Sequence, residues 1–108
     1  MYKKTIGLDG EIYDSQSEAN VADWLYLNDI DYEPHKHLPK PSRSICDFYL
    51  PDYDLWVEYD GLMEVRANDK LEKKKAYYKK QGLKLLLITR DNWERDLLEW
   101  IELGGSDD

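Results

Sequence analysis

The sequence is poor in cysteine, with Cys46 standing alone among 108 residues. A single cysteine excludes an internal disulfide bond and a cysteine-rich zinc site. No apolar run approaches the ~20 residues of a membrane helix. The start, Met1-Tyr2-Lys3-Lys4, also lacks the apolar stretch of a secretory signal peptide. We therefore expect a cytoplasmic protein with no membrane partner.

Positive charge is scarce overall, because 15 lysines and arginines face 23 aspartates and glutamates, for a net charge of -8. This balance is unfavourable for DNA binding, but local charge matters more than the total. Basic residues crowd the stretch from Arg66 to Lys84, in which the only acids are Asp69 and Glu72. Such a run is either a solvated helix face or a surface that binds nucleic acid.

The hydrophobic content of 42% is enough for the core of one domain, which we expect to span residues 1–108. Asp9-Gly10 between short apolar segments predicts a hairpin or an extended arm over residues 1–14. Ser15-Gln16-Ser17-Glu18 has the pattern of a capping box, which predicts a helix from there to about Asn28.

The remaining pattern predicts three strands, a helix, a strand and a final helix. The expected elements are strands over 32–38, 44–50 and 54–60, a lysine-rich helix over 69–81 ended by Gly82, a central strand over 83–89 covered on both faces, and a helix from about Asn92 opened by Asp91 with Glu94 three residues later. We expect residues 104–108 to be disordered. The order α-β-β-β-α-β-α defines a mixed α/β domain.

Three carboxylates stand where packing would not favour them. Asp47 lies inside a strand, where aspartate has a poor propensity, and Glu58 shares a strand face with Asp60. If the two strands are neighbours, Asp47 and Glu58 are candidate ligands for a hard cation such as Mg²⁺; otherwise they lie on a solvated sheet face. Glu18 is either a wet capping-box residue or a third inward-facing carboxylate.

A cation for phosphate chemistry is available on the lysine-rich helix. Lys74 and Lys75 lie three and four residues after Leu71 and flank the stripe that this residue forms with Tyr78. A lysine stem can lie on apolar surface and deliver its ammonium group to a sheet edge. Metal and lysine together would activate water and stabilise charge on a phosphate.

The motifs together resemble the PD-(D/E)xK nuclease superfamily, with particular similarity to phage endonuclease I-type Holliday-junction resolvases and to very-short-patch-repair and homing endonucleases. The matching segments, in chain order, are Ser15-x-x-Glu18, Cys46-Asp47-Phe48-Tyr49-Leu50-Pro51, Val57-Glu58-Tyr59-Asp60-Gly61 and the stretch from Lys74 to Ile88. The resemblance covers about residues 15–90. It implies a restriction endonuclease-like αβββαβ core with a mixed central sheet, to which a C-terminal helix is added here.

By this resemblance, Asp47, Glu58, Glu18 and the peptide oxygen of Tyr59 would hold Mg²⁺ or Mn²⁺. Two positions depart from the family pattern: Cys46 replaces a common proline, and Asp60 replaces the motif lysine. Either the lysine has moved to the following helix, which nominates Lys74 first and Lys70 second, or activity has been lost. The catalytic set would then be Glu18, Asp47, Glu58 and Lys74, with DNA held by Lys70, Lys73, Lys75 and Lys79.

Three functional hypotheses follow from the sequence. The first is a Mg²⁺-dependent DNA endonuclease, specific for DNA structure such as a junction or flap, and a homodimer would double its basic surface. The second is an inactive module on the same fold that binds nucleic acid or a partner. The third is an interaction protein built on the four tryptophans, Trp24, Trp56, Trp93 and Trp100.

Overall fold

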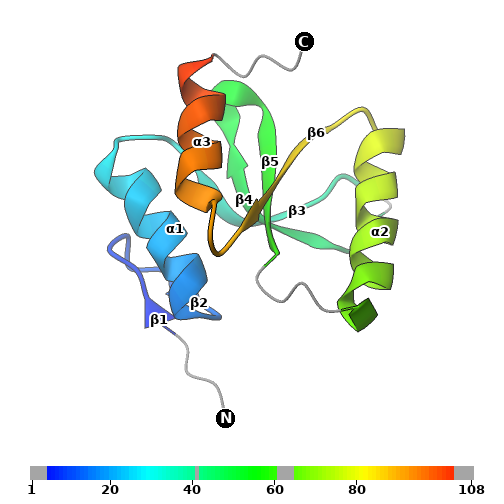
Figure 1. Cartoon of the computed structure of the whole chain (residues 1–108), viewed down its shortest axis with the longest axis horizontal. Helices are drawn as coiled ribbons and strands as arrows, with labels where there is room; N and C mark the ends of the chain where they lie inside the picture. Colours follow the sequence, from blue (N-terminus) through cyan, green and yellow to red (C-terminus); the bar gives the residue numbers. More distant parts are fainter. Residues whose placement is uncertain (1–4, 41, 61–64, 104–108) are drawn as a thin grey trace.

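The computed structural model describes residues 5–40, 42–60 and 65–103, except the side chains of 60 and 65–71. A four-stranded mixed sheet forms the middle layer of the fold (Figure 1). Its strands, in spatial order, are β3 (Glu33–His37), β4 (Ile45–Leu50), β5 (Leu55–Asp60) and β6 (Lys84–Thr89). The first three are antiparallel neighbours, and β6 runs parallel to β5. The mixed α/β class predicted from the sequence is confirmed.

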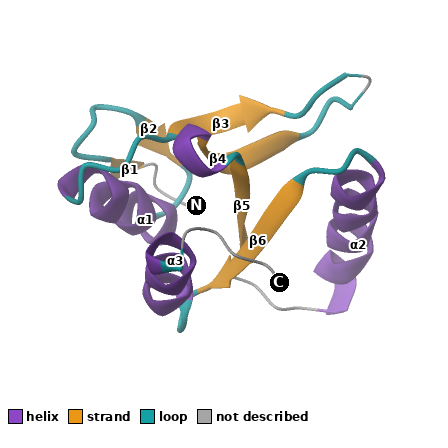
Figure 2. Ribbon diagram, turned by 90° about the horizontal axis from the view of Figure 1, so that it is seen from above, coloured by secondary structure: helices purple, strands orange, loops and turns teal. Residues whose placement is uncertain are grey.

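Helices cover both faces of this sheet. Helices α1 (Gln16–Leu27) and α3 (Trp93–Glu102) lie on one face, and α2 (Val65–Lys80) lies on the other (Figure 2). The short antiparallel hairpin of β1 (Thr5–Ile6) and β2 (Ile12–Tyr13) packs beside α1, so of the two alternatives for the N-terminal region the hairpin is observed. A 3₁₀ turn, η1 (Pro51–Tyr53), joins β4 to β5. Residues 104–108, expected to be disordered, lie outside the described residues.

The two faces of the sheet bury separate apolar clusters. Leu55 and Val57 of β5 face α1 and α3 and form one cluster with Phe48 of β4 and Leu97 of α3. Trp56 faces α2 and contacts Cys46, Leu38 and Tyr78. Alternation along β5 was predicted from the sequence, and it sends Glu58 to the α2 side, where its carboxylate meets Tyr78.

Three details differ from the sequence prediction. β6 is an edge strand and not a central one. Its continuous apolar run is explained by packing on both faces of the sheet, since Leu85 packs on the α2 side and Leu86 and Ile88 pack on the α1 side. Helix α2 begins at Val65, four residues earlier than expected. Helix α3 is capped by the backbone of Asn92, not by Asp91, and no side chain completes that cap.

The start of α1 shows the serine half of the expected capping box. Ser15 is the N-cap, and its hydroxyl accepts a hydrogen bond of 3.1 Å from the backbone N–H of Glu18. Ala22 and Leu25, which lie four and seven residues after Glu18 on one face of the helix, are fully buried. In the described part of the chain, no helix is both long and apolar enough to cross a membrane.

Candidate active site

The candidate site lies between β4, β5 and α2. At the end of the ladder away from the β4–β5 turn, the last pair of β4 and β5 is Phe48 with Val57. The next positions in the same register are therefore Asp47 and Glu58. Glu58 is buried, with 5% of its surface exposed, and Asp47 is half-buried. The two strands therefore bring together two carboxylates that are eleven positions apart in the sequence, which meets the condition of neighbouring strands set out from the sequence.

Lys74 joins these carboxylates from α2. Its Nζ lies 2.7 Å from Oε2 of Glu58 and donates a second hydrogen bond of 2.7 Å to the carbonyl of Ile45. The Lys74 side chain is only 21% exposed, so its stem follows the apolar surface between helix and sheet. An ammonium group has three N–H donors, and these two contacts leave one for a further acceptor.

One hydroxyl group and one backbone amide, neither of them anticipated from the sequence, donate hydrogen bonds to the carboxylates. The Tyr78 hydroxyl donates to Oε2 of Glu58 over 2.6 Å, and the backbone N–H of Tyr59 donates to Oδ2 of Asp47 over 2.7 Å. Tyr78 was expected only as part of the apolar stripe of α2. Tyr59 was expected to offer its carbonyl oxygen; its recorded contact with the site is made by its N–H.

Negative charge at the site is only partly compensated. Burial, followed by repulsion from Glu58, raises the pKa of Asp47 to about 7, although the Tyr59 N–H and Lys74 act in the opposite direction. Burial and the charges of Asp14 and Glu58 also raise the pKa of Glu18. A divalent cation would relieve both effects.

His35 is a further neighbour that the sequence pattern did not single out. Its register position in β3 falls between the pairs Pro34 with Phe48 and Lys36 with Cys46, and therefore opposite Asp47. Its φ of 54° is in the left-handed region, which is unusual for a residue within a strand. Its charge lowers the pKa of Glu18, and its ring lies 5.4 Å from that of Tyr13.

The donor set fits a magnesium-type ion in chemistry. Asp47 and Glu58 offer hard oxygen atoms, and Mg²⁺ is commonly held by one or two carboxylates with water and phosphate completing the shell. Glu18 comes from the opposite side of the sheet and interacts electrostatically with Glu58. Among the described residues, no group of three or more His, Cys, Asp or Glu side chains is arranged to hold a metal ion.

Cys46 is not a nucleophile in this arrangement. Its thiol is fully buried, within hydrogen-bonding distance of the carbonyls of Phe48 (3.1 Å) and Val57 (3.2 Å). Burial and the nearby charge of Glu58 raise its pKa to about 12, so the neutral thiol dominates.

The other candidate residues of α2 lie outside this centre. Lys73 and Lys79 are exposed, and Lys75 is half-buried, with Nζ 3.1 Å from the Glu72 carboxylate. The side chains of Lys70 and Asp60 lie outside the described residues. Exposed basic residues thus lie on the same helix as Lys74, whereas Lys74 itself is the lysine in contact with a site carboxylate.

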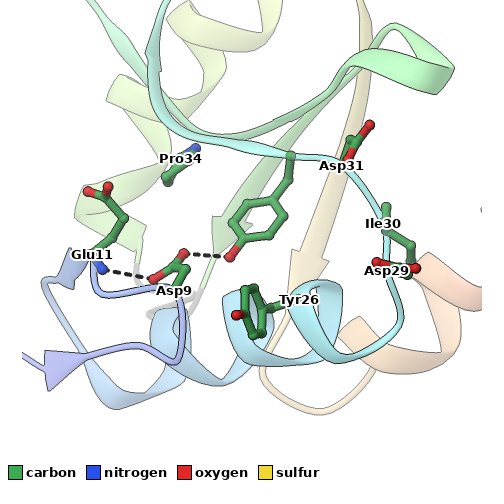
Figure 3. A pocket seen from close by; sticks show the side chains of 8 residues that line it. Asp9, Glu11, Tyr26, Asp29, Ile30, Asp31 and Pro34 are labelled. Carbon is green, nitrogen blue, oxygen red and sulfur yellow. Dashed lines mark hydrogen bonds between the residues drawn. The ribbon is translucent and has the colours of Figure 1, made fainter.

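The acidic surface lies on the other side of the sheet. A hollow of about 620 Å³ beside α1 is lined by Asp9, Glu11, Tyr26, Asp29, Ile30, Asp31, Tyr32 and Pro34 (Figure 3). Burial would raise the pKa of Asp9, but hydrogen bonds from Tyr13, Tyr32 and the Glu11 N–H outweigh it and lower the pKa. Asp9 is thus a structural link between the hairpin and the chain entering β3.

Searches against protein-family models, curated proteins and solved structures found no match to this chain.

Proposed function

We propose that this protein is a Mg²⁺- or Mn²⁺-dependent DNA endonuclease of the PD-(D/E)xK type. The observation that carries the proposal is that Asp47, Glu58 and Lys74, from three separate elements, meet in one partly buried site. The strand order β3-β4-β5-β6, with β6 parallel to β5, agrees with the αβββαβ core that the sequence resemblance implies.

Asp47 and Glu58 would hold the metal ion, with Glu18 as a further carboxylate nearby. The metal would lower the pKa of a bound water and offset charge on the scissile phosphate. Lys74 would use its remaining N–H to orient the attacking water or to stabilise a phosphate oxygen as negative charge develops. In this interpretation Lys74 replaces the motif lysine, whose position is taken by Asp60.

DNA would approach the α2 face. Lys73 and Lys79 are exposed there and, with Lys70 and Lys75 of the same helix, would contact phosphates. The acidic hollow beside α1 lies on the opposite side of the sheet, so its carboxylates are not on the face that DNA would approach. A homodimer would double the basic surface and provide two cutting sites, which suits a branched DNA substrate.

One observation favours a second function, a non-catalytic DNA-binding module on the same fold. Asp60 adds negative charge where the family pattern has lysine. Such a module would keep the basic face of α2 and the ion pair of Lys74 with Glu58 for stability alone.

Incubation with branched, nicked and linear DNA, with Mg²⁺, Mn²⁺ or a chelator, tests the two functions. An endonuclease should cut at least one substrate only when metal is present, and Asp47→Asn and Glu58→Gln should abolish cutting. Glu72→Gln is the matched control, because Glu72 is an exposed carboxylate on α2 that pairs with Lys75. Metal-independent cutting, or equal cutting by Glu58→Gln, would reject the proposal; DNA binding without any cutting would favour the module.

A further inference from the structure

Tyr78 and Lys74 contact the same atom of Glu58. The Tyr78 hydroxyl lies 2.6 Å from Oε2 of Glu58, and Nζ of Lys74 lies 2.7 Å from that oxygen. The two donors lie one turn apart on α2, so a single helix face controls one end of this carboxylate. The other oxygen, Oε1, makes no hydrogen bond or ion pair with the side chains and backbone that the structure describes.

This arrangement assigns different tasks to the two oxygens. A carboxylate oxygen accepts along two lone-pair directions, and the hydroxyl and the ammonium group together use both of them on Oε2. Among the described contacts, Oε1 keeps its acceptor capacity, so it is the oxygen that a cation would contact. Two fixed donors also prevent the Glu58 side chain from rotating freely, which reduces the ordering cost when a ligand binds.

We propose that Tyr78 is a positioning residue that fixes Glu58 so that Oε1 is presented to the metal ion. This inference rests on the proposed metal-dependent function of the site. Tyr78 acts through Glu58 and touches neither the metal nor the DNA. Its own position is fixed by packing, because it is 1% exposed and contacts Trp56 and Cys46 in the buried cluster under α2.

The neighbouring tyrosine provides a matched control. Tyr77 also lies on α2, and its hydroxyl donates a hydrogen bond of 2.5 Å to the carbonyl of Pro39, away from the carboxylates. Tyr78→Phe and Tyr77→Phe each remove one hydroxyl and one hydrogen bond while retaining the ring. A purely structural role for either hydroxyl would change thermal stability but not the affinity for metal.

Calorimetric titration with Mn²⁺ is the deciding measurement. Tyr78→Phe should weaken Mn²⁺ binding by ~10-fold or more, the size typical of a lost hydrogen bond to a metal ligand, whereas Tyr77→Phe should match the parent. Raising the Mn²⁺ concentration should restore most of the cleavage rate of Tyr78→Phe, because the catalytic groups are intact. Thermal unfolding in a chelator verifies that both variants fold.

If Tyr78→Phe does not fold, nuclear magnetic resonance of the parent protein tests the inference instead. The ring-carbon signal of Tyr78 next to its hydroxyl should shift on Mg²⁺ addition, the signal of Tyr77 should not, and Glu58→Gln should remove the effect. Equal Mn²⁺ affinity of the two phenylalanine variants, or an unmoved Tyr78 signal, overturns the inference about Tyr78. The proposed function survives that result if the parent binds metal and Glu58→Gln does not. A parent that binds no metal, or a Glu58→Gln variant that binds it normally, overturns both.

Discussion

Nζ of Lys74 and Oε2 of Glu58 form an ion pair of 2.7 Å that links α2 to β5. The Glu58 side chain is 7% exposed and that of Lys74 is 21% exposed, so the pair is shielded from most of the solvent. Burying a carboxylate is costly unless it is paired and hydrogen-bonded, and Lys74 and Tyr78 supply both compensations. The pair therefore stabilises the docking of α2 and places an ammonium group beside the carboxylates.

Lys74→Ala should lower the turnover of DNA cleavage by ~100-fold or more, the usual cost of removing one electrostatic donor from an active site. Mn²⁺ affinity should change less than in Tyr78→Phe, because removing Lys74 also removes a positive charge that repels the cation, which offsets the lost contact with Glu58. Lys75→Ala is the control, since Lys75 pairs with Glu72 on the surface. Single-turnover rates at saturating Mn²⁺ provide the measurement. Equal rates for Lys74→Ala and the parent would remove Lys74 from the mechanism.

Asp47→Asn should make the metal-free protein more stable at neutral pH. Folding raises the pKa of Asp47 from its ordinary value of 3.8 to about 7, so the folded state binds more protons than the unfolded state between these limits. The free energy of unfolding should therefore fall as pH rises from about 4 to about 7. Asparagine remains neutral, keeps an acceptor for the Tyr59 N–H, and should remove much of this fall.

Urea unfolding in a chelator between pH 4 and pH 8 measures the effect of Asp47. The gain of Asp47→Asn over the parent should be small at pH 4 and on the order of a few kcal/mol at pH 8. Glu72→Asn, a change at an exposed carboxylate, should show no such pH-dependent gain. A gain for Asp47→Asn that is constant with pH would contradict a raised pKa.

Replacing Lys73 and Lys79 with glutamate should lower the affinity for DNA and make that affinity less sensitive to salt concentration. Both side chains are exposed on α2, where they would neutralise phosphates. Losing each phosphate contact should reduce the slope of log affinity against log salt by about one. Lys84→Glu is the control, because Lys84 begins β6 and its ammonium lies 6.0 Å from the Trp100 ring of α3. Fluorescence anisotropy at several salt concentrations would show whether binding responds instead to Lys84.

Asp29→Gly should raise the free energy of unfolding by about 1 kcal/mol, because Asp29 follows α1 with a φ of 62° in the left-handed region, where a side chain is strained. Asp31→Gly removes the same charge from the same acidic hollow but lies outside the set of positive-φ residues. The difference between the two variants in thermal denaturation isolates the backbone effect. A lower melting temperature for Asp29→Gly than for Asp31→Gly would contradict it.

The sequence by itself determined the class of fold and the type of most elements, because these depend on short-range patterns. Alternation in residues 54–60 specified a strand with Glu58 on the face opposite Leu55 and Val57, and Ser15 specified the start of α1. Short-range reasoning also drew attention to Asp47 and Glu58 within strands and to Lys74 or Lys75 beside an apolar stripe, and the family resemblance then favoured Lys74. Their roles in metal binding and catalysis remain predictions.

Only the tertiary structure decided which groups meet. An apolar run indicates cover on both faces but not the number of neighbouring strands, so β6 was misplaced at the centre of the sheet. Tyr78 had the pattern of an ordinary core residue, since helical spacing reports the buried face and not the polar atom that a hydroxyl will reach. His35 stands opposite Asp47 because of strand register, which long-range pairing sets. Burial and the approach of Glu58, which raise the pKa of Asp47, likewise exist only once β4, β5 and α2 are assembled.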